Sequence, residues 1–227
     1  MRLVPQRLSI IVPALNEAQG IRAALGALSA LRARGHEVIL VDGGSDDGTA
    51  DLAVPFCDGV LRSERGRAKQ MNAGASAAQG EALLFLHADT RLPPNADQAV
   101  FNALERSSWG RFDVSIDARH PLLPLVACAM NLRSRLTGIA TGDQAIFVRR
   151  DAFAGFPEIP LMEDVAFSAA MKRRGRPACL RAQVVTSGRR WERDGVVRTI
   201  VLMWRLRLLY ALGASPHRLA RHYAEHR

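Results

Sequence analysis

The 227-residue sequence is poor in cysteine and has no long apolar run. Cys57, Cys128 and Cys179 lie far apart, without a CxxC pair or a Cys/His spacing, which argues against a disulfide framework and a zinc site. No run of about 18 apolar residues occurs, so we expect no membrane span. The first apolar run ends at Asn16 and Glu17 without a small-residue cleavage pattern, which argues against a secretory signal. These absences predict a cytoplasmic protein.

Lysine is also scarce, and the positive charge is unevenly distributed. Residues 1–165 hold 17 Lys and Arg against 19 Asp and Glu, whereas residues 166–227 hold 14 against 3. Only Lys69 and Lys172 are lysines, a bias that genome composition also produces. Nucleic-acid binding is therefore an alternative supported by charge alone, and it predicts a steep salt dependence. We expect no nucleic-acid partner.

Short apolar runs alternate with helical patterns along the chain. Strands are predicted over residues 8–12, 37–41, 60–61, 82–86, 109–116 and 145–148, and helices over 18–34, 68–78, 121–137, 164–174 and 195–212. Unbroken apolar strands that alternate with helices are typical of a parallel sheet covered on both faces. We predict a single α/β unit with an open, mostly parallel sheet, helices on both faces and a helical C-terminal extension.

Two strings at the ends of the first two strands lie at the edge where ligands of open α/β sheets bind. The first contains Pro13, Leu15 and the polar pair Asn16 and Glu17, and the second contains Asp42, Gly44 and Ser45. Helix capping is the alternative for Asn16 and Glu17, and likewise for Asp46 or Asp47. Asp42 differs because it ends an apolar strand, where its carboxylate would accept a hydrogen bond from a ribose hydroxyl or a base N–H.

His87, Ala88 and Asp89 follow the strand over residues 82–86. Strand alternation would place the side chains of His87 and Asp89 on one side, and a carboxylate holds Mg²⁺ or Mn²⁺ against phosphate oxygens. Neither a P-loop nor a GxGxxG string is present to bind phosphates instead. We therefore favour a metal role for Asp89 over the alternative, in which it caps the next helix.

Glu163 and Asp164 open the helix predicted to begin at residue 164. Acidic residues are common at helix starts because they complement the helix dipole. The residues alone therefore favour a structural role for this pair.

Taken in order, the strings VPALNE, VDGGSDDGT, RGRAKQMNAGASAAQGEALLFLHAD and MED resemble the successive motifs of the family 2 glycosyltransferases. The resemblance covers roughly residues 8–170. It implies the GT-A fold, an inverting transfer from a nucleoside-diphosphate sugar, and a Mn²⁺ or Mg²⁺ cofactor. The ending HADT resembles a bacterial subgroup of small, stand-alone transferases.

The resemblance also implies roles for individual residues. Asp89 matches the metal-binding acid at the end of the DXD motif, and Asp164, beside Glu163, matches the catalytic base of the ED motif. Contacts to the nucleotide or the sugar are implied for Pro13, Leu15, Asn16, Glu17, Asp42, Gly44, Ser45, Arg67, Gln70, Asn72, His87, Ala88, Gly142, Asp143 and Gln144, and Arg190 is a candidate for the diphosphate.

Two positions depart from the family pattern. Gly43 stands where many relatives have a second Asp, so the donor nucleotide can be of the UDP, GDP or dTDP type. His87 replaces the first acid of DXD, which leaves Asp89 as the one firm carboxylate for the cation. The loss of that acid makes a non-catalytic nucleotide-sugar-binding protein one alternative. A sugar-1-phosphate nucleotidyltransferase is another, but it would need a glycine-rich basic loop where this chain has ALNE.

The basic C-terminal quarter contains the predicted helix over residues 195–212. Arg198 and Arg205 share one face of this helix and Arg207 lies nearly opposite, so it is only imperfectly amphipathic. The sequence is compatible with two alternatives for this helix, a core helix and a helix that contacts an anionic membrane. We predict a donor half over about residues 1–115, an acceptor half over about 116–227, and peripheral contact with the inner face of the cytoplasmic membrane, which suits a lipid-linked acceptor.

Overall fold

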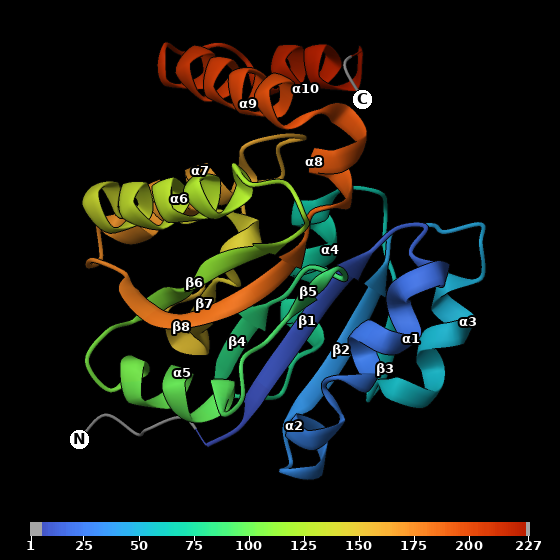
Figure 1. Cartoon of the computed structure of the whole chain (residues 1–227). Coiled ribbons are helices and arrows are strands. Elements are labelled where there is room, and N and C mark those ends of the chain that lie inside the picture. The colour runs from blue at the N-terminus through green and yellow to red at the C-terminus, as the bar shows by residue number, and fades with distance from the viewer. Residues whose placement is uncertain (1–5, 226–227) are drawn as a thin grey trace.

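The computed structural model describes residues 6–225 and contains an eight-stranded sheet of order β3-β2-β1-β4-β7-β6-β8-β5 (Figure 1). The strands are β1 (Leu8–Ala14), β2 (Glu37–Asp42), β3 (Gly59–Arg62), β4 (Ala82–Phe85), β5 (Thr90–Arg91), β6 (Trp109–Asp117), β7 (Phe147–Arg149) and β8 (Ala178–Ser187). Strands β3, β2, β1 and β4 run parallel, as do β6 and β8, whereas β7 runs antiparallel to β4 and β6. The carboxyl ends of β1, β2 and β4 therefore meet at one edge of the sheet.

Helices cover both faces of the sheet because successive strand residues point to opposite faces. Ile10 packs in a core with α1 (Ala18–Gly26), α2 (Ser29–Ala33), α3 (Thr49–Ala53) and α5 (Ala96–Leu104). Its neighbour Ile11 packs in a second core with α4 (Arg67–Ala77) and α7 (Glu163–Lys172). Single 3₁₀ turns cover Val54–Phe56, Gly142–Gln144 and Arg150–Ala152. The prediction of an open α/β sheet with helices on both faces is confirmed.

The single helix predicted over residues 18–34 was wrong, because the chain forms α1 and α2 instead. The Leu28 N–H donates to the carbonyl of Leu25, one residue closer than an α-helix requires. This tighter turn ends the first helix, and both Leu28 and Leu31 still reach the core.

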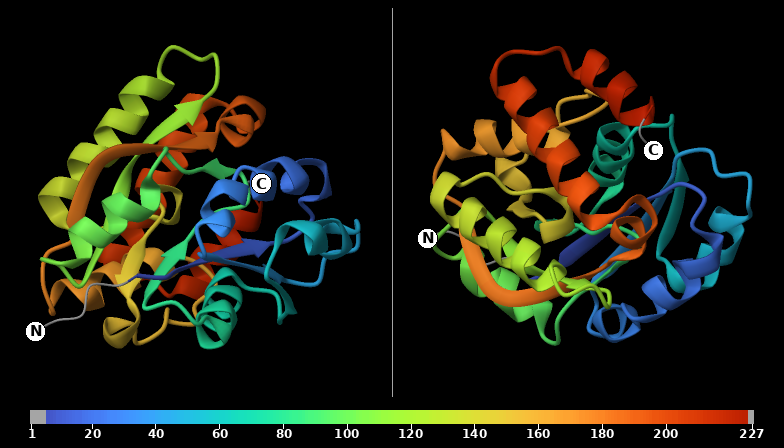
Figure 2. Two further views of the ribbon diagram at one scale, coloured as in Figure 1. Left: turned by 90° about the horizontal axis from the view of Figure 1, so that it is seen from below. Right: turned by 45° about the horizontal axis from the view of Figure 1, so that its top comes forward.

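The C-terminal helices lie across the carboxyl edge of the sheet (Figures 1 and 2). They are α8 (Arg189–Asp194), α9 (Val196–Ala211) and α10 (Pro216–Glu225), and α6 (Leu123–Thr137) lies beside them. On α9, Val196 packs with Ile116 and Leu123, and Leu206 packs with Met162, the residue before α7. No helix within residues 6–225 is long and apolar enough to cross a membrane.

Buried polar contacts hold α6 against β6. The fully buried Arg111 donates from Nε to Ser134 Oγ at 3.0 Å, and Asn131 bonds both the N–H and the carbonyl of Val114 at 2.9 Å. Because Asn131 and Ser134 lie on one side of α6, these bonds set the direction in which the other side chains of the helix point.

Candidate functional site

The loops that follow β1 and β2 interlock through side-chain hydrogen bonds. The Asn16 N–H donates to Ser45 Oγ at 2.9 Å, and Asn16 Oδ1 accepts from the Asp46 N–H at 3.1 Å. The buried Asp42 carboxylate accepts the N–H groups of Gly44 and Ser45 and so shapes the turn from within. Pro13 and Leu15 are half-buried beside these loops.

The capping alternative holds for Asp47 rather than for Asn16 or Glu17. Asp47 accepts the N–H groups of Ala18 and Thr49, the first residues of α1 and α3. Glu17 makes no side-chain cap and instead faces Arg189, with 3.4 Å between its carboxylate and the guanidinium. Burial raises the pKa of Glu17, and the positive charge of Arg189 offsets this rise only in part.

Gln70 and Asn72, two residues matched to nucleotide contacts, make structural bonds. Gln70 Nε2 donates to the carbonyls of Ala14 and Val41 at 2.8 Å and ties β1 to β2. A Cβ at Gly43 would lie 3.0 Å from this side chain, so an acid at position 43 would have to displace it. Asn72 bonds both backbone polar groups of Phe156. Ligand roles for these two side chains stay predictions.

His87 and Asp89 do not share one side of a strand, so the alternation argument was wrong. Strand β4 ends at Phe85, and a turn closed by the Thr90 N–H and the His87 carbonyl follows it. His87 points at the Gly142–Gln144 turn, where its Nδ1 lies 3.2 Å from Asp143 Oδ1 and a Cβ at Gly142 would lie 2.4 Å from its Nε2. The buried Nε2 has no hydrogen-bond partner within the described chain.

The turn at Gly142–Gln144 connects several predicted site residues. Burial alone would raise the pKa of Asp143, but the hydrogen bond and charge of His87, with the charges of Arg67 and Arg190, lower it to about 2. Asp143 therefore stays ionised and faces the cavity described below. Its neighbour Gln144 is fully buried and bonds Asn131 Oδ1, so Gln144 supports the turn from inside.

Asp89 lies in the turn between β4 and β5, next to the end of β8. Its carbonyl accepts the Ser187 N–H, and its carboxylate lines the cavity and accepts a long bond of 3.3 Å from Thr90 Oγ1. The N-cap position of the next helix, α5, is Asn95, so Asp89 is not its cap. Ala88 is buried behind it.

The donor set at Asp89 fits a cation that is shared with a ligand. No group of three or more His, Cys, Asp or Glu residues capable of holding a metal lies within residues 6–225. Mg²⁺ commonly binds one or two protein carboxylates and completes its shell with phosphate oxygens and water. A single accessible carboxylate beside a cavity suits that mode, whereas it does not suit an all-protein metal cage.

Asp164 and Glu163 open α7 on the other side of the Gly142 turn. Asp164 Oδ2 accepts the Gly142 N–H at 2.9 Å, and Asp164 Oδ1 accepts the Val165 N–H at 2.7 Å. Glu163 is buried, with its carboxylate 3.8 Å from Arg67. Burial and the charge of Asp164 raise the pKa of Glu163. Burial alone would lower the pKa of Arg67, but the negative charges of Glu163, Asp143 and Asp164 outweigh burial and raise this pKa above its usual value.

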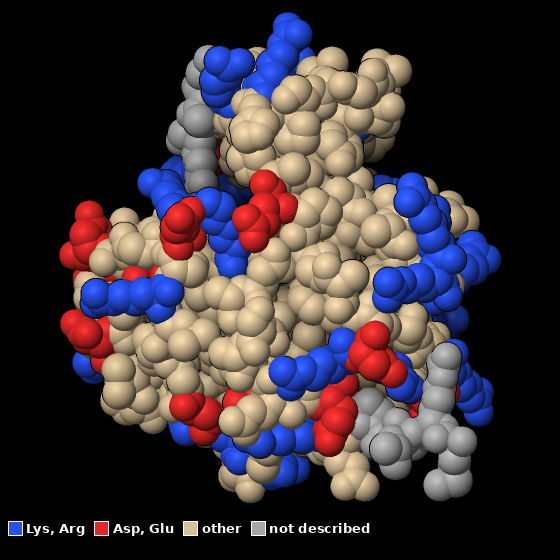
Figure 3. Space-filling view, turned by 180° about the vertical axis from the view of Figure 1, so that it is seen from behind, with Lys and Arg blue, Asp and Glu red and all other residues tan. Residues whose placement is uncertain are grey.

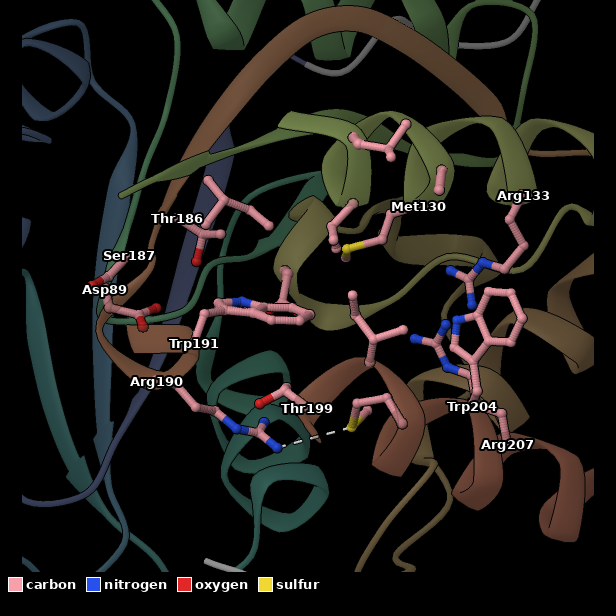
Figure 4. A pocket seen from close by; sticks show the side chains of 17 residues that line it. Asp89, Met130, Arg133, Thr186, Ser187, Arg190, Trp191, Thr199, Trp204 and Arg207 are labelled. Carbon is pink, nitrogen blue, oxygen red and sulfur yellow. Dashed lines mark hydrogen bonds between the residues drawn. The ribbon is translucent and has the colours of Figure 1, made fainter. Parts of the chain in front are cut away.

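A cavity of about 390 Å³ lies under the C-terminal helices (Figure 4). Its walls are mainly apolar. Of the residues that line it, Asp89, Asp143 and Arg190 were predicted as site residues from the sequence. Asp89 and Arg190 lie toward one end and Arg133 and Arg207 toward the other. The lining also includes Ile116, Leu125, Met130, Thr186, Ser187, Trp191, Thr199, Ile200, Met203 and Trp204. The available signal in the sequence was the presence of arginines within two largely apolar helices, Arg133 and Arg135 in α6 and Arg198, Arg205 and Arg207 in α9.

Solved structures of glycosyltransferases share this architecture. S. aureus TarS 1–349 in complex with UDP-GlcNAc is 21% identical with a TM-score of 0.64, over 80% of this chain and 58% of that one. The mannosyltransferase PcManGT from Pyrobaculum calidifontis, in complex with GDP-Man and Mn²⁺, is 22% identical with a TM-score of 0.57, over 80% and 56%. The fold is the GT-A type of glycosyltransferases. Residues 9–153 match the family described as Glycosyl transferase family 2, and the chain belongs to this family.

Curated relatives match a shorter part of the chain. A PGL/p-HBAD biosynthesis glycosyltransferase of Mycobacterium tuberculosis (strain ATCC 25177 / H37Ra) is 37% identical over 91 residues, which are 37% of this chain and 36% of that protein. An undecaprenyl-phosphate 4-deoxy-4-formamido-L-arabinose transferase of Yersinia pestis bv. Antiqua (strain Angola) is 24% identical over 157 residues, 63% of this chain and 48% of that protein. The matches thus span about a third to a half of these relatives' lengths.

Proposed function

We propose that the protein transfers a sugar from a nucleoside-diphosphate sugar to an acceptor hydroxyl, with inversion at the anomeric carbon. One observation carries the proposal: the Gly142 turn contacts Asp164 and contributes Asp143 to the wall of the cavity that Asp89 lines. Asp164 accepts the Gly142 N–H, and the next residue, Asp143, lines the same cavity as Asp89. A carboxylate held next to this cavity and a second carboxylate on its wall suit a general base and a cation ligand in a single displacement.

Asp89 would hold the divalent cation, with Mn²⁺ or Mg²⁺ as candidates. When bound, the cation neutralises charge that develops on the departing diphosphate. Arg190 lines the same end of the cavity and supplies a guanidinium for the diphosphate. The neighbours bound to UDP-GlcNAc and to GDP-Man support a nucleotide-sugar donor for this chain.

Asp164 would act as the general base. It accepts the acceptor hydroxyl proton while the hydroxyl oxygen bonds to the anomeric carbon and the bond from that carbon to the diphosphate oxygen breaks with its electron pair. The Gly142 and Val165 N–H groups hold the carboxylate in position. In this scheme residues 1–115 form the donor half and residues 116–227 the acceptor half.

A thermal-shift screen with UDP, GDP and dTDP, each with and without Mn²⁺, tests the donor assignment. We expect one nucleotide to raise the melting temperature only when Mn²⁺ is present, because a ligand that binds the native state at 100 times its Kd stabilises it by about 2.7 kcal/mol. The absence of a shift with every nucleotide contradicts the proposal. Glycosyl transfer from the matching donor sugar then separates an enzyme from a non-catalytic nucleotide-sugar-binding protein.

We also propose that the enzyme attaches to the surface of an anionic membrane. Helix α9 buries Val196, Thr199 and Leu206 on one face. On its other face it exposes apolar residues at helical spacing, each by 60% or more, which supports the membrane-facing alternative: Val197, Val201, Trp204, Leu208 and, at its end, Leu212. On α6, Leu125, Leu132 and Leu136 form a second exposed apolar stripe. Seen from behind, the lobe of the C-terminal helices shows a broad uncharged surface with cations at its margins (Figure 3). Apolar stripes with peripheral cations suit an anionic bilayer.

Sedimentation with anionic vesicles tests this attachment. The protein is expected to pellet with vesicles at low salt and to be substantially released at high salt, because each surface cation contributes about 1 kcal/mol and salt screens that contribution. The variant Trp204→Ser is expected to pellet less than the wild type, and Val54→Ser, an exposed apolar position remote from both stripes, serves as its control. Protein that stays in the low-salt supernatant contradicts membrane attachment.

A further inference from the structure

Two arginines from different helices meet in the large cavity. Arg133 comes from α6 and Arg207 from α9, and both line the cavity wall. In Figure 4 the two guanidinium groups point toward each other beside the indole ring of Trp204, at the end of the cavity opposite Asp89. The bonds of Asn131 and Ser134 to β6 fix the side of α6 from which Arg133 projects.

These guanidinium groups have unmet hydrogen-bonding capacity. Arg133 Nε and Nη2, and Arg207 Nε, are buried without a hydrogen-bond partner in the described part of the chain. Burial and the charge of Arg207 lower the pKa of Arg133 to about 10, and burial lowers the pKa of Arg207. Arg133 therefore stays charged at neutral pH. Two like charges in a mainly apolar cavity are unfavourable unless an anion lies between them.

The cavity between Asp89 and the arginine pair is lined by large apolar side chains. Met130, Trp191, Ile200 and Met203 contribute to its walls. Leu125 and Trp204 line it as well and are 67% and 71% exposed, so the cavity is continuous with the apolar stripes of α6 and α9. An apolar group bound here has a path to the surface between the two helices.

We infer that Arg133 and Arg207 bind a phosphate monoester of the acceptor, and that the cavity walls hold the acceptor's apolar body. This inference rests on the proposed glycosyl transfer and names the class of its acceptor. Two guanidinium groups match a phosphate monoester because it carries a charge of roughly −1.5 to −2 and three acceptor oxygens. The donor diphosphate is assigned to the opposite end of the cavity, beside Asp89 and Arg190.

The proposed base acts electrostatically on the arginine pair. The charge of Asp164 raises the pKa of both Arg133 and Arg207 and so opposes the effect of their burial. In the proposed transfer the acceptor reacts through its hydroxyl. Its oxygen forms the bond to the anomeric carbon, its proton passes to Asp164, and the diphosphate leaves with the electron pair of the broken bond. The acceptor phosphate itself is unchanged.

Calorimetry with decyl phosphate below its micelle concentration tests the inference on the full chain. The wild type is expected to bind it, and Arg133→Gln and Arg207→Gln are each expected to weaken binding about tenfold or more, since each removes a charged hydrogen-bond donor. Arg205→Gln, which removes an exposed cation from the same helix, is the matched control and is expected to change little. Decanol is expected to bind wild type and variants alike.

Two further binding measurements test the role of the apolar walls and distinguish a failure of this inference from a failure of the proposed function. Inorganic phosphate is expected to bind more weakly than decyl phosphate, and equal affinities would overturn the role of the apolar walls. Binding of the nucleotide selected with Mn²⁺ is expected to survive in both glutamine variants. If it is lost while the fold is intact by circular dichroism, the pair serves the donor and the inference fails. If only decyl phosphate fails to bind, the acceptor assignment falls while the glycosyltransferase proposal stands.

Discussion

Replacing Asp89 by Asn is expected to abolish metal-dependent nucleotide binding. Asp89 is the carboxylate proposed to hold the cation at the donor end of the cavity, and asparagine keeps its shape but removes the negative charge that holds a hard cation. Its carbonyl bond to the Ser187 N–H is independent of the side chain, so the fold should persist. Calorimetry of nucleotide binding with and without Mn²⁺ measures the effect.

The matched control is Asp51→Asn, which removes an exposed carboxylate on α3 and should leave Mn²⁺-dependent binding unchanged. Unchanged Mn²⁺-dependent binding in Asp89→Asn would contradict the metal role. The cation would then have to be held by the nucleotide and other residues of the cavity.

Replacing Asp164 by Asn is expected to lower turnover by about 10² to 10⁴, the usual contribution of a positioned general base, while nucleotide binding is retained. The asparagine carbonyl can still accept the Gly142 N–H, which holds the turn in place. Initial rates of glycosyl transfer at saturating donor measure the loss, and calorimetry checks nucleotide binding.

Glu158→Gln serves as the control for this change, because Glu158 is an exposed carboxylate in the loop before α7. It is expected to keep normal turnover. Near-normal turnover in Asp164→Asn would instead leave Asp164 with a structural role at the start of α7 and at the Gly142 turn.

The sequence predicted the N-terminal half of the fold better than the C-terminal half. β1, β2 and β4 are buried on both faces, so their sequences are unbroken apolar runs that can be recognised locally. β8 was missed because it is half-exposed and includes Arg181, and its place is set by pairing with β6 and β5. Helix α10 was missed too, because its polar sequence has few apolar positions.

The candidate site residues also differ in how much of their role the sequence could predict. Asp89 and Asp164 could be predicted as site residues because the order of motifs is a property of the chain. The structural bonds of Gln70 and Asn72, by contrast, join residues that are distant in sequence, Val41 and Phe156 among them. The turn after β4 was also misjudged, since a strand's alternation holds only as far as its hydrogen bonds continue.

The sequence by itself determined the family, the strand ends and the acids that they carry, because periodicity and motif spacing are local. Tertiary structure alone decided that Asp89 and Asp143 line one cavity, that Asp164 accepts the Gly142 N–H, that His87 pairs with Asp143, and that Arg133 meets Arg207. Each of these contacts depends on how α6, α9 and the Gly142 turn pack over the sheet edge. Packing directions of separate elements are set by the whole core, so local sequence patterns do not contain them.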